Sequence, residues 1–166
     1  LVETVVGGFQ RADQATGDEP LASATFHHLE GLGMDQQDNI YVAESDKRQI
    51  RKIDLHNQKV TVHADFSSFP YFSSHDIRVD WEGNVIVPGH DASTLYRVAP
   101  SGAISLVAGQ TYGLTQGPVT SSLFRRPTGV DFDSAGNLFV ADRNWGIRKI
   151  TRFQPMNPPM IPANCP

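Results

Sequence analysis

The hydrophobic and polar positions of this chain repeat one pattern three times. In each copy an apolar segment ends at an aspartate, three residues follow, and an asparagine opens a second apolar segment. Asp38, Gly83 and Gly136, together with the asparagines that follow them, are residue types that accept a positive φ at low cost in tight turns. The second apolar segment is continuous, as expected for a strand covered on both faces. The pattern predicts three β-hairpins, over residues 31–44, 76–89 and 129–142.

Further strands are predicted after each hairpin. A third strand carries basic residues on its wetter side, and a fourth follows a polar turn in the first two copies. The third copy has no such fourth strand, because prolines that cannot donate ladder hydrogen bonds follow Thr151. We therefore predict units of antiparallel strands over residues 29–64, 75–108 and 127–151.

The N-terminus carries an apolar segment that belongs to none of these units. Residues 1–8 align with residues 103–109, the fourth strand of the middle unit, so we predict an outer strand there. The offset of 98 residues between Phe26 and Phe124 recurs at other positions of the first and third units. These two units are therefore siblings, and the middle unit is a shorter variant.

The spacing of the repeats indicates the fold class. Asn84 follows Asn39 by 45 residues and Asn137 follows Asn84 by 53, which lies in the range of propeller blades. We predict an all-β protein, a β-propeller built of four-stranded antiparallel blades, with three blades in this chain. The blades occupy residues 1–151, and a proline-rich C-terminal tail occupies residues 152–166.

Three blades do not close a propeller, which needs at least about four. We expect apolar residues on the open faces of the first and the last sheet to stay uncovered, and open faces and sheet edges favour association. A second copy of the chain, or missing blades, would then close the ring, with the first strand of each copy completing the third blade of the other. The start at Leu1 rather than Met is what a processed or truncated product would show. The residues expected on the open faces are Ile40, Val42, Leu138 and Val140.

The third unit resembles the NHL repeat, which builds six-bladed β-propellers. Residues 127–142 and 147–150 carry the motif's proline, glycine and aspartate turn, its Gly-Asn pair, its inner strand and its Ile-Arg-Lys-Ile segment. The first unit matches nearly as well, whereas the middle unit departs at His75 and at residues 88–90. The resemblance covers residues 1–151 and implies a propeller that binds peptides, proteins or RNA on an end face. Structurally related propellers include lyases and lactonases with a metal on the central axis.

The same resemblance suggests an axial metal site. Glu30, His75 and Thr128 stand at the entrance of the strand nearest the central channel. Residues 75–77 resemble segments that supply zinc ligands in amidating lyase propellers, and Glu30 resembles the acidic ligand of lactonase propellers. A catalytic zinc needs about three protein ligands, and one chain offers two, Glu30 and His75, for a divalent metal such as zinc or calcium. In the alternative interpretation His75 bonds a backbone carbonyl and Glu30 is solvated.

The loops after the second strand of each unit carry the candidate ligand-binding residues. They combine charge with an aromatic side chain, a composition found at recognition surfaces. In the alternative interpretation these loops form a solvated rim, and the tryptophan packs against a neighbouring blade. No catalytic residue is assigned, and the candidate ligand-binding residues are Asp46, His90, Asp91, Arg143 and Trp145.

Charge and composition narrow the classes of partner. The net charge of -4 comes without a basic cluster, so we expect no nucleic acid partner. No apolar run is long enough to cross a bilayer, so no membrane insertion is expected. Cys165 is the only cysteine, which excludes an intramolecular disulfide. No signal peptide is visible, and the lack of cysteine pairs fits the cytosol without excluding secretion, so the compartment is not determined. An extracellular or periplasmic location, as of a secreted protein, is slightly favoured.

Three functions fit these observations. The leading hypothesis is a noncatalytic NHL-type propeller module, a scaffold that binds a protein, peptide or glycan ligand on an end face. The second is a metal-dependent propeller enzyme of the lyase or lactonase type with an axial site, and it is the less favoured of the two. The third is a structural assembly unit or a fragment of a longer chain.

Overall fold

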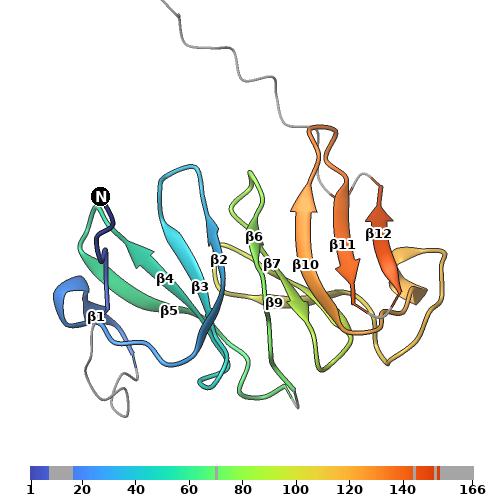
Figure 1. Cartoon of the computed structure of the whole chain (residues 1–166), viewed down its shortest axis with the longest axis horizontal. Helices are drawn as coiled ribbons and strands as arrows, with labels where there is room; N and C mark the ends of the chain where they lie inside the picture. Colours follow the sequence, from blue (N-terminus) through green and yellow to red (C-terminus); the bar gives the residue numbers. More distant parts are fainter. Residues whose placement is uncertain (8–16, 70, 144, 152, 154–166) are drawn as a thin grey trace, which may run out of the picture.

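The computed structural model describes residues 1–7, 17–69, 71–143, 145–151 and 153. Within them the chain is all-β apart from short turns of 3-10 helix, and its strands form three antiparallel sheets. Figure 1 shows the three sheets side by side in chain order. The predicted fold class is confirmed.

The first sheet has five strands in the order β1-β5-β4-β3-β2. Hairpins join successive strands from β2 to β5, while the two-residue β1 pairs with the outer edge of β5. The strands are β1 (Glu19–Pro20), β2 (Leu29–Met34), β3 (Ile40–Glu44), β4 (Gln49–Asp54) and β5 (Lys59–Asp65).

The second sheet has the order β6-β7-β8-β9 and the third β10-β11-β12. The third sheet has no fourth strand among the described residues, as predicted. The 3-10 helices η2 (Leu21–Ser23) and η3 (Val119–Ser121) lie in the long segments before β2 and β10. The strands of these two sheets are β6 (Arg78–Val79), β7 (Val85–Gly89), β8 (Thr94–Val98), β9 (Ile104–Ala108), β10 (Pro127–Phe132), β11 (Leu138–Asp142) and β12 (Gly146–Ile150).

An aspartate and the asparagine four residues later tie the first hairpin turn of each sheet. The asparagine side-chain amide donates to the carboxylate at 2.7 to 2.9 Å in the pairs Asp35–Asn39, Asp80–Asn84 and Asp133–Asn137. The positive φ falls on the residue before each asparagine, at 61°, 80° and 78° for Asp38, Gly83 and Gly136. The prediction that the asparagines themselves take a positive φ is wrong. Their contribution to the turn is the side-chain hydrogen bond to the aspartate.

The sheets pack face to face through apolar clusters. Ile50 of the first sheet and Val87 of the second belong to one cluster, and Ile86 of the second sheet and Leu138 of the third belong to another. Gly31 brings β2 close to the second sheet, because a Cβ atom there would lie 2.7 Å from the backbone carbon of Asp76. Inter-sheet contact therefore requires glycine at that position.

The open faces of the first and third sheets differ from the expectation. Leu138 and Val140 are fully buried against the second sheet, since alternate side chains of a strand point to opposite faces. Ile147 is 72% exposed and faces the other way. At the opposite end of the molecule, Ile40 and Val42 belong to a cluster with Leu21 and Ala24, which cover that face.

The N-terminal residues form no strand in the single chain. Residues 1–7 have no sheet partner among the described residues, and β1 is the outermost strand of the first sheet. Residues 1–7 therefore do not form the predicted outer strand over residues 1–8 within one copy. Residue 8 lies outside the described ranges. Of the tail over residues 152–166, the structure describes Phe153, whose ring lies 4.7 Å from the Arg97 guanidinium. No helix in the described part of the chain is long and apolar enough to span a membrane.

The first and the third sheet each contain a buried ion pair, which binds the long segment that precedes the sheet in the chain. Arg51 donates to Glu44 at 3.1 Å and to the Gly17 carbonyl at 3.1 Å, while Glu44 accepts the His27 N–H at 2.7 Å. The third sheet repeats each bond, because Arg148 donates to Asp142 and to the Thr115 carbonyl, and Asp142 accepts the Arg125 N–H. Burial raises the pKa of Asp142, although these donors oppose it. The sibling relation of the two units is confirmed.

Candidate functional site

Four polar side chains from different parts of the repeat meet near the turns that join the second strand of each sheet to the third. Figure 1 shows these turns after β3, β7 and β11. Glu30 lies in β2 of the first sheet, and His75 precedes β6 of the second. His90 follows β7, and Arg143 follows β11 of the third sheet. We call these four residues the end-face cluster.

The end-face cluster is a continuous series of contacts. His75 Nδ1 lies 3.4 Å from Glu30 Oε1. The rings of His75 and His90 meet edge to face, with their centroids 4.7 Å apart. His90 Nε2 then lies 3.4 Å from a terminal nitrogen of Arg143. The cluster therefore links all three sheets.

The members of the end-face cluster differ in how tightly they are held. The His90 side chain is 8% exposed, and its Nδ1 lies 2.9 Å from the Asp91 carboxylate. Glu30 is 14% exposed and accepts a hydrogen bond from the Ser45 hydroxyl. The interpretation of Glu30 as a solvated residue is therefore wrong. His75 is 42% exposed, so its ring can be reached from solvent.

The structure divides the predicted ligand-binding residues. His90, Asp91 and Arg143 lie in or beside the end-face cluster, whereas Trp145 lines a separate groove beside β12. Trp145 is 57% exposed in the single chain.

Asp46 lies at the border of the end-face cluster. Its carboxylate is 2.5 Å from His27 Nδ1 and 3.2 Å from His28 Nδ1. Hydrogen bonding to His28, and then to His27, lowers the pKa of Asp46. Sequence reasoning did not identify Ser45, although its position in the same loop as Asp46 was an available signal.

The residues of one chain do not fit a metal ion. Glu30 and His75 do lie together, but no group of three or more His, Cys, Asp or Glu side chains in the described part of the chain could hold a metal. His90 cannot serve as the third ligand here, because its two nitrogens face Asp91 and Arg143. A site for zinc would need about three protein ligands. The predicted zinc or calcium site therefore stays a prediction that requires ligands from outside the chain.

No protein-family model and no curated protein matches this sequence. Solved structures do resemble it, among them a streptogramin B lyase (TM-score 0.55, 12% identity, 83% of this chain and 45% of that one). A gluconolactonase from Xanthomonas campestris gives a TM-score of 0.54 at 19% identity, over 90% of this chain and 42% of that one. A chain of a nidogen/laminin complex gives 0.58 at 16%, over 76% of this chain and 46% of that one.

These structures are propeller-type proteins, so the fold belongs to the β-propeller class. At such identities the likeness shows the fold alone. The chain spans less than half the length of each of the three. They include enzymes as well as a binding complex, so the fold does not select between catalysis and binding.

Proposed function

We propose that this chain is a noncatalytic NHL-type propeller module that binds a protein or peptide through the end-face cluster. The observation that carries the proposal is the series of contacts from Glu30 through His75 and His90 to Arg143. Residues of three different sheets and their loops contribute to it, so a ligand seated there would contact all three sheets. Loops held by a rigid scaffold are common binding sites in proteins.

The chemistry of the end-face cluster favours an acidic side chain on the ligand. Arg143 supplies a planar guanidinium, which recognises carboxylates through paired hydrogen bonds. His75, which contacts Arg143 only through His90, is 42% exposed and can donate a further hydrogen bond. Asp91 and Ser45 hold His90 and Glu30 in place, so little side-chain ordering would accompany binding.

The proposal is tested with an array of peptides containing Asp or Glu and, in parallel, a glycan array. A peptide whose binding is confirmed by calorimetric titration should bind Arg143→Ala and His75→Ala about tenfold or more weakly than the parent chain, since buried arginine contacts dominate interface energies. The matched control is Lys59→Ala, which changes an exposed residue of β5, and this variant should bind as the parent does. Binding only to glycans, or loss in the control alone, would overturn the proposal.

A second candidate, a metal-dependent enzyme of the lyase or lactonase type, rests on the adjacency of Glu30 and His75. Because one chain lacks a third ligand in its described part, this function needs ligands from a second copy. Elemental analysis of the purified assembly decides it. Stoichiometric zinc or calcium that is lost in His75→Ala would support the enzyme, and a metal-free assembly would remove it.

A further inference from the structure

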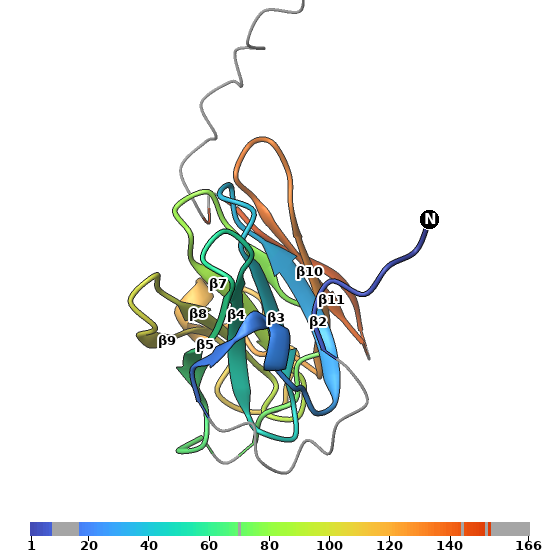
Figure 2. The ribbon, with the colours of Figure 1, turned by 90° about the vertical axis from the view of Figure 1, so that its left-hand side faces the viewer.

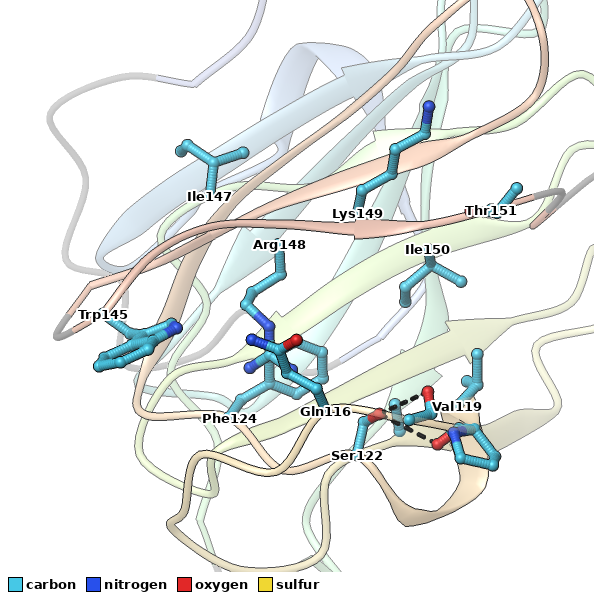
Figure 3. A pocket seen from close by; sticks show the side chains of 13 residues that line it. Gln116, Val119, Ser122, Phe124, Trp145, Ile147, Arg148, Lys149, Ile150 and Thr151 are labelled. Carbon is cyan, nitrogen blue, oxygen red and sulfur yellow. Dashed lines mark hydrogen bonds between the residues drawn. The ribbon is translucent and has the colours of Figure 1, made fainter.

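The third sheet has a groove along β12, the edge strand of its described part (Figure 3). Its volume is about 480 Å³. Figure 3 shows Arg148 and Ile150 pointing from β12 towards the loop that carries Gln116 and Val119. Lys149 points to the opposite face of the strand. The groove therefore lies between a strand and a loop.

The corresponding place in the first sheet is filled by a strand. There β5 lies between β4 and β1, and Glu19 and Pro20 pair with Val60 and Lys59. The offset of 98 residues carries Glu19 and Pro20 onto Gly117 and Pro118, which line the groove. The groove is thus the position of a fourth strand that the described part of the chain does not supply to its third sheet.

Gly7 lies next to the first sheet as Gly109, at the end of β9, lies next to the third. A Cβ atom on Gly7 would lie 3.5 Å from the Phe26 ring, and one on Gly109 would lie 3.1 Å from the Phe124 ring. Both glycines have a positive φ, of 95° and 76°. Gly109 directly follows β9, the outer strand of the sheet before the third. By this equivalence residues 1–6 correspond to β9, and they would be the outer strand of a sheet that precedes the first sheet in the ring.

We propose that residues 1–6 of a second copy lie in this groove as the fourth strand of the third sheet, and that the exchange is reciprocal. The two chains then form one six-bladed ring with a twofold axis. Leu1 and Val2 are fully exposed in the single chain, and Val5 is 56% exposed. Adding a strand to a free sheet edge satisfies the backbone groups of both partners.

The register of the added strand follows from the two complete sheets. Ile53 pairs with Val60 in the first, and Val98 pairs with Ile104 in the second. The same alignment places Val2 opposite Ile150 and Glu3 opposite Lys149. Two apolar side chains and one pair of opposite charges would then meet across the strands, and such pairs stabilise antiparallel sheets.

The open faces of the first and third sheets would form a second contact between the two copies, related by the same twofold axis. On the first sheet Leu32 and Met34 are 53% and 48% exposed, and on the third Ile147 is 72% exposed. In the paired ring the first sheet of one copy faces the third sheet of the other, so these apolar side chains are covered together. Exposed apolar patches of this kind mark association surfaces.

Sedimentation velocity of the 166-residue chain at micromolar concentration tests the pairing. A particle of twice 18.2 kDa is expected, and deletion of residues 1–6 should shift it to the monomer. A parent chain that is monomeric, or a dimer that survives the deletion, would overturn the proposal.

Charge reversal tests the register without depending on the deletion. Because the exchange is reciprocal, each dimer holds two Glu3–Lys149 pairs, so Glu3→Lys and Lys149→Glu should each weaken the dimer by up to about thirtyfold, and the double variant should restore it. The matched control is Lys59→Glu, which changes an exposed charge on an outer strand and should leave the dimer intact. Additive effects in the double variant would overturn the proposed pairing of Glu3 with Lys149.

A peptide of residues 1–7 tests the groove directly. Added to the chain that lacks residues 1–6, in a Trp81→Phe background, it should shift the fluorescence of Trp145 to shorter wavelength by covering the indole. A peptide carrying Glu3→Lys should bind more weakly, and Lys149→Glu in the chain should reverse that preference. Equal binding of both peptides to both chains would overturn the strand exchange.

Discussion

Arg51 and Glu44 form an ion pair of 3.1 Å with both side chains fully buried. The pair is enclosed on one side by the Phe26 ring, 5.6 Å from the guanidinium, and Glu19 adds a second carboxylate at 2.6 Å. Because the pair also accepts a backbone N–H and donates to a backbone carbonyl of the preceding segment, it fastens that segment to the first sheet.

Replacing Arg51 with methionine should lower the free energy of unfolding by about 3 to 5 kcal/mol, since it leaves Glu44 buried without its cation. Urea denaturation at pH 7 measures the loss. Lys59→Met breaks an exposed pair with Asp18 and should change stability by less than about 1 kcal/mol. Equal effects of the two substitutions would contradict the role given to burial.

Two glycines at equivalent positions should respond differently to alanine. Gly31→Ala should destabilise the chain by about 1 to 3 kcal/mol, because the new methyl group would overlap the Asp76 backbone. At Gly129 the nearest atom is 3.5 Å away, on Ala141, so Gly129→Ala should be nearly neutral. Thermal unfolding of both variants checks the order, and a Gly129→Ala variant that is the less stable one would contradict it. Close packing against the neighbouring sheet therefore requires glycine at position 31 but not at position 129.

The asparagine of each hairpin turn should matter in proportion to the burial of its aspartate. Asp80 is 3% exposed, so Asn84→Val should cost about 1 to 3 kcal/mol by leaving a buried carboxylate without its amide donor. The Asp133 side chain is 35% exposed, and water can replace part of the lost bond in Asn137→Val. Chemical denaturation should therefore rank Asn84→Val as the more damaging change, and the reverse order would refute this account.

Tyr41 should make stability fall at alkaline pH. Burial, with Asp35 as its neighbour, raises the pKa of Tyr41 from 10.0 to about 12 in the folded state. The folded state thus holds the phenol proton more strongly than the unfolded state, so the stabilisation is complete below pH 10 and is lost as the pH rises towards 12. Tyr41→Phe should flatten the fall over that window in unfolding measurements. A fall of unchanged steepness in the variant would assign it to other groups.

The strands, the hairpins and their chain order could be predicted because the signals for them are local. Strand periodicity and turn residues act within about ten positions, and the segment from Asp133 to Asp142 carries both. The φ angles of the asparagines could not be predicted in this way, because Asp38 and Asn39 are both suited to a positive φ. Only the bond from Asn39 to Asp35 decides between them.

The sequence by itself determined a three-fold repeat of antiparallel hairpins, the sibling relation of the first and third units, and the lack of a fourth strand in the described part of the third sheet. Only the tertiary structure decided that Glu30, His75, His90 and Arg143 form one cluster while Trp145 lines a separate groove. It also decided that Leu138 and Val140 face inward. The reason is that contacts between sheets depend on how whole faces pack and turn against one another, and no short segment of the sequence carries that relation.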